Sequence, residues 1–353
     1  MPRKLQYFDF NGLGEKIRYL LHYTGQEFED VRHDITTWPI PEIKETLPFG
    51  QFPLYEEDGR VLCQSLAIAK YVARGTDLIP SDPWKQAQVD SAVYSIMDYN
   101  KHVVAAVHEP DPQKKIELRN KLFTEYIDYY FSRFEKLLKE NGGYFSGKYF
   151  DFNGLGEKIR YLLHYTGQEF EDVRHDITTW PIPEIKETLP FGQFPLYEED
   201  GRVLCQSLAI AKYVARGTDL IPSDPWKQAQ VDSAVYSIMD YNKHVVAAVH
   251  EPDPQKKIEL RNKLFTEYID YYFSRFEKLL KENGGYFSGK LSWGEFVLCA
   301  AVDGTNFFFS TEIQKNYPAV KAVCEEIWNA PGVKEYIAAR GPYSLDGIKK
   351  RFG

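Results

Sequence analysis

The sequence predicts an α/β domain followed by an all-α domain, with the first domain and the start of the second present twice. Strand and helix patterns alternate in the order βαβαββα over residues 4–74, and long helical patterns follow. Residues 7–148 also recur letter for letter as residues 149–290. Removing one 142-residue copy from the 353-residue chain leaves 211 residues, the size of a compact two-domain protein.

The repeat is a duplication on the scale of domains, because the repeats of solenoid proteins span only about 20–50 residues. Gly147-Lys148 runs directly into Tyr149, without a Gly/Ser or Pro linker. A recent tandem duplication, an engineered fusion and an error in gene assembly all account for identical copies. The missing linker favours duplication or an assembly error over a fusion.

Each element of the first domain has its own local signal. Gly25 ends the first amphipathic helix, and Asp58-Gly59 is a two-residue hairpin turn. The expected elements are strand Lys4–Phe10, helix Glu15–Thr24, strand Glu27–Arg32, helical segment Trp38–Leu47, strands Pro53–Glu57 and Arg60–Cys63, and helix Ser65–Arg74. The first βαβ unit should be parallel and right-handed, and the hairpin adds an antiparallel edge. This is the thioredoxin-like arrangement.

The second domain should be entirely helical. Its expected helices are Trp84–Val107 and Asp111–Lys139, repeated in the second copy, and then Ala319–Asn329 and Val333–Arg340. Ser292 and Glu295 have the spacing of a capping box, which predicts a helix start. We therefore expect thioredoxin-like domains at 1–76 and 149–218, a partial helical domain at 83–148 and a full one at 225–353.

Composition excludes several classes of protein. The net charge of −8 argues against a nucleic-acid partner, since phosphate contacts need clustered Lys and Arg. No run of about 18 apolar residues predicts a membrane helix, and the first residues lack the apolar core of a secretory signal. The four cysteines form no CxxC pair, and the eight histidines have no zinc-ligand spacing. We expect a cytoplasmic protein with buried free thiols and no metal.

Four sequence blocks taken together resemble the sigma-class glutathione transferases, and the arthropod members in particular. They read LQYFDFNGLGEKIRYLL, WPIPEIKETLPFGQFPLY, QSLAIAKYVAR and LSWGEF. The resemblance implies the glutathione transferase fold over the whole chain. It also implies glutathione as co-substrate, conjugation to small hydrophobic electrophiles with reduction of lipid peroxides as a further activity, and a homodimer or an intramolecular pseudo-dimer. A structural, crystallin-like relative and a prostaglandin isomerase are the alternatives.

The resemblance assigns the catalytic role to Tyr7 and its repeat Tyr149. A phenol that donates a hydrogen bond to the glutathione thiolate lowers the pKa of the thiol. The absence of CxxC at the first strand–helix turn opposes a thiol–disulfide oxidoreductase. Gly12 and Gly14 alone are a weak signal and do not form a dinucleotide-binding fingerprint.

The resemblance also assigns the glutathione ligands. Pro53 should be cis and present the Phe52 backbone to the cysteinyl part, and Gln64-Ser65 should open a helix whose N–H groups suit the γ-glutamyl carboxylate. Asp98 should reach the glutathione amino group across a dimer or between the copies. The full set is Trp38, Lys44, Gln51, Phe52, Pro53, Gln64, Ser65 and Asp98, with the repeats Trp180, Lys186, Gln193, Phe194, Pro195, Gln206, Ser207 and Asp240.

The electrophile pocket is expected to be apolar. Its predicted lining is Phe10, Leu13 and Met97, with the repeats Phe152, Leu155 and Met239. In the family that the chain resembles, the vertebrate members that isomerise prostaglandin H to prostaglandin D carry Arg where Leu13 stands, so Leu13 favours an apolar electrophile over a carboxylate-bearing one.

The duplication leaves each copy incomplete in a different part. Copy one has the intact first strand but lacks the late helices, so its long helices should expose apolar faces. Copy two has Gly147 in the place of Leu5, which weakens its first strand. We expect copy two, with the full helical domain, to be the more complete transferase.

Overall fold

The computed structural model describes the chain except residues 1–2, 140–148, 151–153, 176–185, 187–188 and 341–353. Its contacts divide the chain into two compact units. One combines Met1–Pro80 with Gly217–Tyr343, and the other is Ser81–Arg216. Each unit therefore joins the thioredoxin-like domain of one copy to long helices of the other copy.

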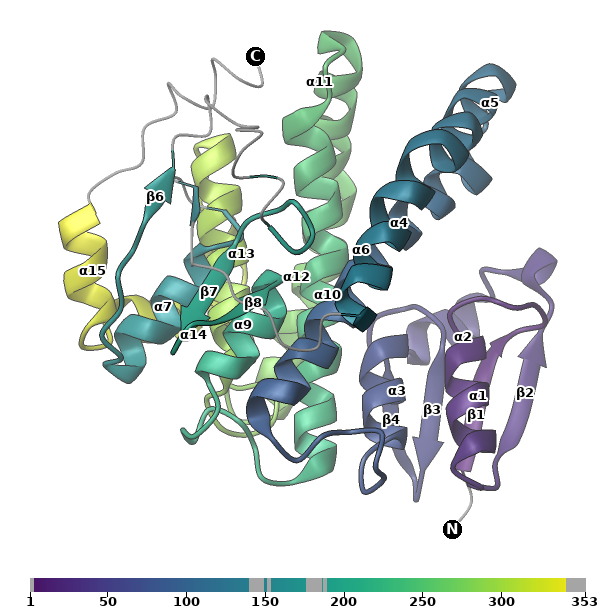
Figure 1. The fold of residues 1–353 in the computed structure, drawn as a ribbon, viewed down its shortest axis with the longest axis horizontal. Helices are drawn as coiled ribbons and strands as arrows, with labels where there is room; N and C mark the ends of the chain where they lie inside the picture. The colour runs from purple at the N-terminus through teal and green to yellow at the C-terminus, as the bar shows by residue number, and fades with distance from the viewer. Residues whose placement is uncertain (1–2, 140–148, 151–153, 176–185, 187–188, 341–353) are drawn as a thin grey trace. The chain divides into compact units, whose positions relative to one another are not determined.

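The first unit contains a four-stranded sheet in the order β2-β1-β3-β4 (Figure 1). β1 pairs in parallel with β2 and antiparallel with β3, which pairs antiparallel with β4. The elements are β1 (Arg3–Phe8), α1 (Glu15–Tyr23), β2 (Glu29–His33), η1 (Ile35–Thr37), α2 (Pro41–Thr46), β3 (Leu54–Glu57), β4 (Arg60–Cys63) and α3 (Ser65–Val72). The expected order βαβαββα and the thioredoxin-like arrangement are confirmed.

The core of this domain lies between the sheet and the helices α1 and α3. Leu5, Ile17, Tyr55 and Ile68 have no exposed surface there. Trp226, at the start of helix α10, packs into the same cluster. Burying an apolar side chain of this kind contributes about 1.5–3 kcal/mol to folding stability. The contact with α10 therefore helps to stabilise the thioredoxin-like domain of this unit.

Helices complete the first unit. They are α10 (Pro225–His250), α11 (Pro254–Lys263), η4 (Leu264–Tyr268), α12 (Ile269–Glu282), α13 (Trp293–Phe309), η5 (Ile313–Asn316), α14 (Pro318–Asn329) and α15 (Val333–Arg340). The capping box at Ser292 and Glu295 is confirmed, with the Ser292 backbone N–H donating to Glu295 Oε2 at 2.8 Å.

The helix expected over Asp111–Lys139 is observed, and it contains a π-helical turn that the sequence did not predict. The segment consists of α5 (Pro112–Lys121), a π-helical turn η2 (Leu122–Tyr126) and α6 (Ile127–Lys139). The Thr124 hydroxyl donates to the Asn120 carbonyl oxygen at 3.0 Å. Such a bond to the carbonyl four residues back competes with the regular helical bond and perturbs the helix locally.

The second unit begins with α4 (Pro83–His108), α5, η2 and α6 and continues into the second thioredoxin-like domain. That domain contains β5 (Tyr149–Phe150), α7 (Glu157–Thr166), β6 (Arg174–His175), β7 (Leu196–Glu199), β8 (Arg202–Cys205) and α9 (Ser207–Val214). Within the described residues, β5–β6 and β7–β8 form separate two-stranded sheets. Gly147, expected to weaken the first strand, lies outside the described residues.

Identical side chains differ in burial between the two units. Ile96 on α4 is 45% exposed, whereas its repeat Ile238 on α10 is fully buried, and Phe131 is 53% exposed while Phe273 is fully buried. In the first unit α13 packs against α10 and α14 packs against α12. The exposure of Ile96 and Phe131 confirms the expected exposed faces in copy one. None of the described helices has the length and apolarity needed to cross a membrane.

Candidate functional site

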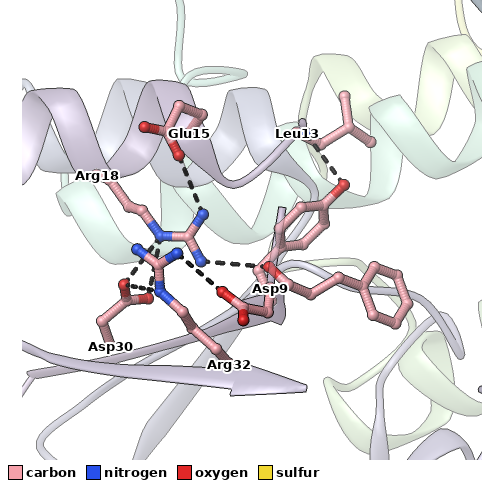
Figure 2. Close-up of polar contacts among 8 residues, drawn as sticks. Asp9, Leu13, Glu15, Arg18, Asp30 and Arg32 are labelled. Carbon is pink, nitrogen blue, oxygen red and sulfur yellow. Dashed lines mark hydrogen bonds and ion pairs between the residues drawn. The ribbon is translucent and has the colours of Figure 1, made fainter. Parts of the chain in front are cut away.

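Tyr7 lies near the end of β1 with its ring buried and its hydroxyl at the start of α1. The hydroxyl oxygen accepts a hydrogen bond from the Leu13 backbone N–H at 3.1 Å (Figure 2). Burial raises the pKa of Tyr7, and the Leu13 N–H and the Arg18 charge oppose that rise. The phenol is therefore protonated at neutral pH, with one lone pair engaged and its proton available to a ligand.

Two glycines let the loop after β1 contact this tyrosine. A Cβ atom on Gly14 would lie 2.6 Å from Tyr7 Cδ1, and one on Gly12 would lie 2.8 Å from the Tyr7 hydroxyl oxygen. Any side chain at either position would have to displace the ring. The Gly12-x-Gly14 pair, which resembles a fragment of a nucleotide motif, thus serves the placement of Tyr7.

A buried ion-pair network beside Tyr7 fixes α1 against β2. Figure 2 shows Arg18 between Glu15 and Asp30. Its Nε donates to both Asp30 carboxylate oxygens at 3.0 and 3.1 Å, and a terminal nitrogen donates to Glu15 at 3.1 Å. Copy two repeats this arrangement, with Arg160 Nε donating to Asp172 at 3.0 and 3.1 Å. The network thus links to β2 the first turn of α1, which directly follows the loop that contacts the Tyr7 hydroxyl.

Gln64 and Ser65 stand at the N-terminus of α3, where backbone N–H groups lack helical partners. Ser65 is the first helical residue and is buried, and Gln64 precedes it with φ of 71°. The Gln64 side-chain Nε2 donates to Ser237 Oγ and to Asp240 Oδ2, both at 3.0 Å. Asp240 belongs to the second copy, so the two copies meet at this helix end.

The second unit contains the reciprocal arrangement. Gln206 Nε2 donates to Asp98 Oδ2 at 2.9 Å and to Ser95 Oγ at 3.1 Å. Gln206 also has a positive φ, of 70°. Asp98 therefore reaches the helix end of the other copy, in line with the expectation that it acts between copies. Its role as a glutathione ligand stays a prediction.

The loop before β3 carries the other predicted ligands of copy one. The Phe52–Pro53 peptide bond is cis, as expected, and so is Phe194–Pro195 in copy two. The Gln51 side-chain oxygen accepts from Gln64 Nε2 at 3.3 Å. These residues lie beside the N-terminus of α3.

Tyr271 on α12 holds this loop, a role that the sequence analysis missed. Its hydroxyl donates to the Phe49 carbonyl oxygen at 2.9 Å, and the Lys44 ammonium lies 5.6 Å from its ring centroid. In the second unit, Tyr129 of copy one donates to the Phe191 carbonyl oxygen at 2.7 Å, and Lys186 lies 5.8 Å from its ring centroid. The positive φ of Gly50 and Gly192 brings the loop backbone against these hydroxyls.

The expectation that Trp38 lies within a helix is wrong. Trp38 follows η1, and a cis bond to Pro39 separates it from α2. Two prolines in three residues interrupt the helical hydrogen bonding at this point. The Trp38 ring packs 5.6 Å from Phe8 and 5.0 Å from Phe52, measured between ring centroids.

Several predicted residues of copy two fall outside the described part of the chain. These are Phe152, Trp180 and the side chain of Tyr149, whose backbone forms β5. Gln193, Phe194 and Pro195 are described, and Phe194 and Pro195 are buried. The two candidate sites therefore cannot be compared at the catalytic tyrosine or at Trp38 and its repeat.

The predicted electrophile-binding residues divide between the units. Phe10 and Leu13 are 40% and 43% exposed beside Tyr7, with the Phe10 ring 5.6 Å from the Tyr7 ring. Met239 belongs to the same unit, whereas Met97 and Leu155 belong to the other one. The predicted lining methionine in the same unit as Phe10 and Leu13 is thus the one from copy two.

Lys158 is a second residue that the sequence analysis missed. It lies in the first turn of α7, is 3% exposed, and its Nζ donates to the Leu155 carbonyl oxygen at 2.9 Å. Nζ also lies 3.4 Å from Ser207 Oγ. Burial lowers the pKa of Lys158 to about 7. A lysine at the start of a helix normally reads as a solvated charge, so its position next to Ser207 could not be predicted.

The four cysteines are free and buried, as expected. Cys63 Sγ lies 3.2 Å from Ser233 Oγ, and burial raises the pKa of the Cys63 thiol to about 12. This thiol is therefore a poor nucleophile at neutral pH. Among the described residues no cluster of His, Cys, Asp and Glu has the arrangement of a metal site.

Comparisons with known proteins give concordant results. The family described as "Glutathione S-transferase, N-terminal domain" matches residues 3–74 and 145–216, and "Glutathione S-transferase, C-terminal domain" matches 239–340. A glutathione S-transferase of Anopheles gambiae is 32% identical over 193 residues, covering 54% of this chain and 94% of the relative. Human hematopoietic prostaglandin D synthase is 30% identical over 201 residues, with the same two coverages. The structure of prostaglandin synthase D of Nilaparvata lugens is similar with a TM-score of 0.53 and 35% identity, covering 57% of this chain and 99% of that one.

Proposed function

The chain belongs to the glutathione S-transferase family, and on that premise we propose that it conjugates the glutathione thiolate to small hydrophobic electrophiles. The observation that carries the proposal is the Tyr7 phenol. Its oxygen accepts a hydrogen bond from the Leu13 N–H, which leaves its O–H free to donate to a bound ligand. A bound thiolate accepting that hydrogen bond would be stabilised relative to the thiol.

Glutathione would be held by the helix end that Gln64 and Ser65 form. The N–H groups at the start of α3 and the Ser65 hydroxyl suit the γ-glutamyl carboxylate, and Asp240 suits the α-amino group. The backbone of Phe52 next to the cis Pro53 suits the cysteinyl unit, and Trp38 and Lys44 suit the glycine carboxylate. The thiolate then attacks the electrophilic carbon, a carbon–sulfur bond forms, and the leaving group departs with its electron pair.

We further propose that the enzyme is of the sigma class, cytoplasmic, and active as an intramolecular pseudo-dimer. The Gln64–Asp240 and Gln206–Asp98 contacts support the pseudo-dimer, because each candidate site takes its helix end from one copy and its carboxylate from the other. Light scattering of the purified protein tests this: a particle of 41.0 kDa is expected, and one of twice that mass would indicate a homodimer. The domain limits predicted at residues 76, 83, 148, 218 and 225 belong to the same proposal.

Prostaglandin isomerisation is the second candidate, because two of the similar proteins are named prostaglandin synthases. Leu13 and Leu155 offer no positive charge to a substrate carboxylate, so we place this activity behind conjugation. Lipid-peroxide reduction would use the same thiolate. A crystallin-like protein without activity is the remaining alternative.

The test is a conjugation assay with an aryl halide and glutathione. Activity in the parent chain that falls at least tenfold in Tyr7→Phe/Tyr149→Phe supports the proposal. Each single variant then shows which copy is active, with copy two expected to contribute more. Full activity in the double variant would refute the phenol mechanism, and no conjugation by the parent would leave the crystallin-like alternative.

A further inference from the structure

Lys158 carries a buried positive charge that the proposed chemistry does not yet use. Its Nζ donates to the Leu155 carbonyl oxygen at 2.9 Å and approaches Ser207 Oγ at 3.4 Å. The neighbouring Glu157 carboxylate is 3.5 Å from the Arg160 guanidinium. No carboxylate lies within ion-pair distance of Lys158 Nζ in the described part of the chain. The Glu157 charge opposes the effect of burial on the pKa of Lys158 only in part, so the position favours a further anion.

The Lys158 ammonium lies near the N-terminus of α9. Ser207 is the first residue of that helix and is 6% exposed. The unpaired N–H groups of a first helical turn and its positive dipole end favour an anion. The Lys158 ammonium, the Ser207 hydroxyl and the helix end therefore converge on one small region.

A negative charge, that of Asp98, lies near the same helix end. Asp98 Oδ2 accepts from Gln206 Nε2 at 2.9 Å, and Gln206 directly precedes Ser207. A cation beside Ser207 and an anion beside Gln206 form a pair of complementary charges for a zwitterionic amino-acid head group. The γ-glutamyl end of glutathione is such a group, with an α-carboxylate and an α-ammonium on one carbon.

We propose that Lys158 binds the α-carboxylate of the γ-glutamyl group in the copy-two site, with Nζ and Ser207 Oγ donating to it together. The inference rests on the proposed function and adds a ligand that makes the site selective for an α-amino acid. Lys16 is the sequence equivalent in copy one. It is only partly buried, and among the described residues no hydrogen bond joins its Nζ to Ser65. Copy one therefore provides a matched reference.

The test uses calorimetry on the full chain with three ligands. The first is glutathione, the second is 4-aminobutyryl-cysteinylglycine, which lacks the α-carboxylate, and the third is glutaryl-cysteinylglycine, which lacks the α-amino group. Gln64→Ala/Ser65→Ala serves as the background, so that binding reports copy two alone.

In the Gln64→Ala/Ser65→Ala protein, which keeps Lys158, glutathione should bind about 10- to 100-fold more tightly than the ligand that lacks the α-carboxylate. Lys158→Met should reduce this preference below about threefold and leave the preference over the amine-free ligand unchanged. Lys158→Arg should retain most of the carboxylate preference, and Lys16→Met should retain all of it. The Lys158→Arg variant and the unchanged preference for glutathione over the amine-free ligand are the controls. Both would be lost if the substitution at Lys158 misfolded the site.

Three outcomes overturn the inference. One is an unchanged carboxylate preference in Lys158→Met, another is equal loss of both preferences, and the third is a background protein that binds no glutathione while the parent binds it. Failure of the parent chain itself to bind glutathione refutes the proposed function instead, so the two failures are distinguishable.

Discussion

The side-chain amide of Gln64 donates a 3.0 Å hydrogen bond to the carboxylate of Asp240, which lies 176 positions later in the chain. The same two residue types meet in the second unit, where Gln206 donates to Asp98 at 2.9 Å. Each contact joins the start of a helix in one copy to a long helix of the other. Each of these Gln–Asp contacts joins two copies of the same sequence. The duplication places both copies in one chain.

Removing the charge of either aspartate should weaken glutathione binding at one site only. Asp240→Asn should act on the site at Gln64 and Asp98→Asn on the site at Gln206, because each carboxylate belongs to the opposite copy. We expect about 10- to 100-fold weaker binding at the affected site, the effect of losing a charge-assisted hydrogen bond.

Calorimetric titration with glutathione measures this as the number of tight sites, which should fall from two to one in each single variant. Lys115→Met removes a charge on α5, a helix that carries none of the predicted site residues, and serves as the control. Two undisturbed sites in both aspartate variants would contradict the assignment of these carboxylates to the ligand.

Much of this site could be predicted from the sequence, and the unpredicted parts have physical reasons. The order of strands and helices, the cis bond at Pro53 and the helix end at Ser65 follow from local signals and the resemblance. Trp38 lies outside a helix because Pro39 and Pro41 interrupt helical hydrogen bonding, a local signal to which the sequence analysis gave too little weight. Tyr271 and Lys158 act through contacts with distant segments, which residue spacing does not encode.

Identical residues in the two copies should respond differently to the same substitution. Phe273→Ala removes a ring that packs 5.0 Å from Tyr241 and 5.4 Å from Tyr317, so it should lower the free energy of unfolding by about 3–5 kcal/mol. Phe131→Ala removes a ring that is 53% exposed, and should cost less than about 1 kcal/mol. Urea titrations of both variants measure the difference, and equal losses would show that the two environments are alike.

Gly14→Ala should disturb Tyr7 without unfolding the protein. The new Cβ would lie 2.6 Å from the Tyr7 ring, while the φ of −75° at Gly14 suits alanine, so the ring must move and the backbone need not. A displaced phenol should lower kcat of the copy-one site by about 10- to 100-fold with a smaller change in KM. The kinetics should be measured in the Tyr149→Phe background. Gly304→Ala, where a Cβ meets nothing within 4 Å, should leave kcat unchanged.

The buried lysine of copy two should make folding stability depend on pH. Burial lowers the pKa of Lys158 from 10.5 to about 7. Between these values the unfolded chain binds more protons than the folded one, so the free energy of unfolding rises with pH in this window. For one such group the gain between pH 7 and pH 9 is about 2 kcal/mol.

Other groups also titrate in this range, and comparison with Lys158→Met cancels their effects. The parent chain should gain about 2 kcal/mol of stability relative to Lys158→Met between pH 7 and pH 9, measured by urea unfolding at each pH. Lys16, whose pKa burial lowers to about 8, should give a smaller gain over the same interval when Lys16→Met is the reference. Parallel pH profiles for the parent and Lys158→Met would mean that this ammonium is solvated or already paired, and would also remove the electrostatic basis for a carboxylate at Ser207.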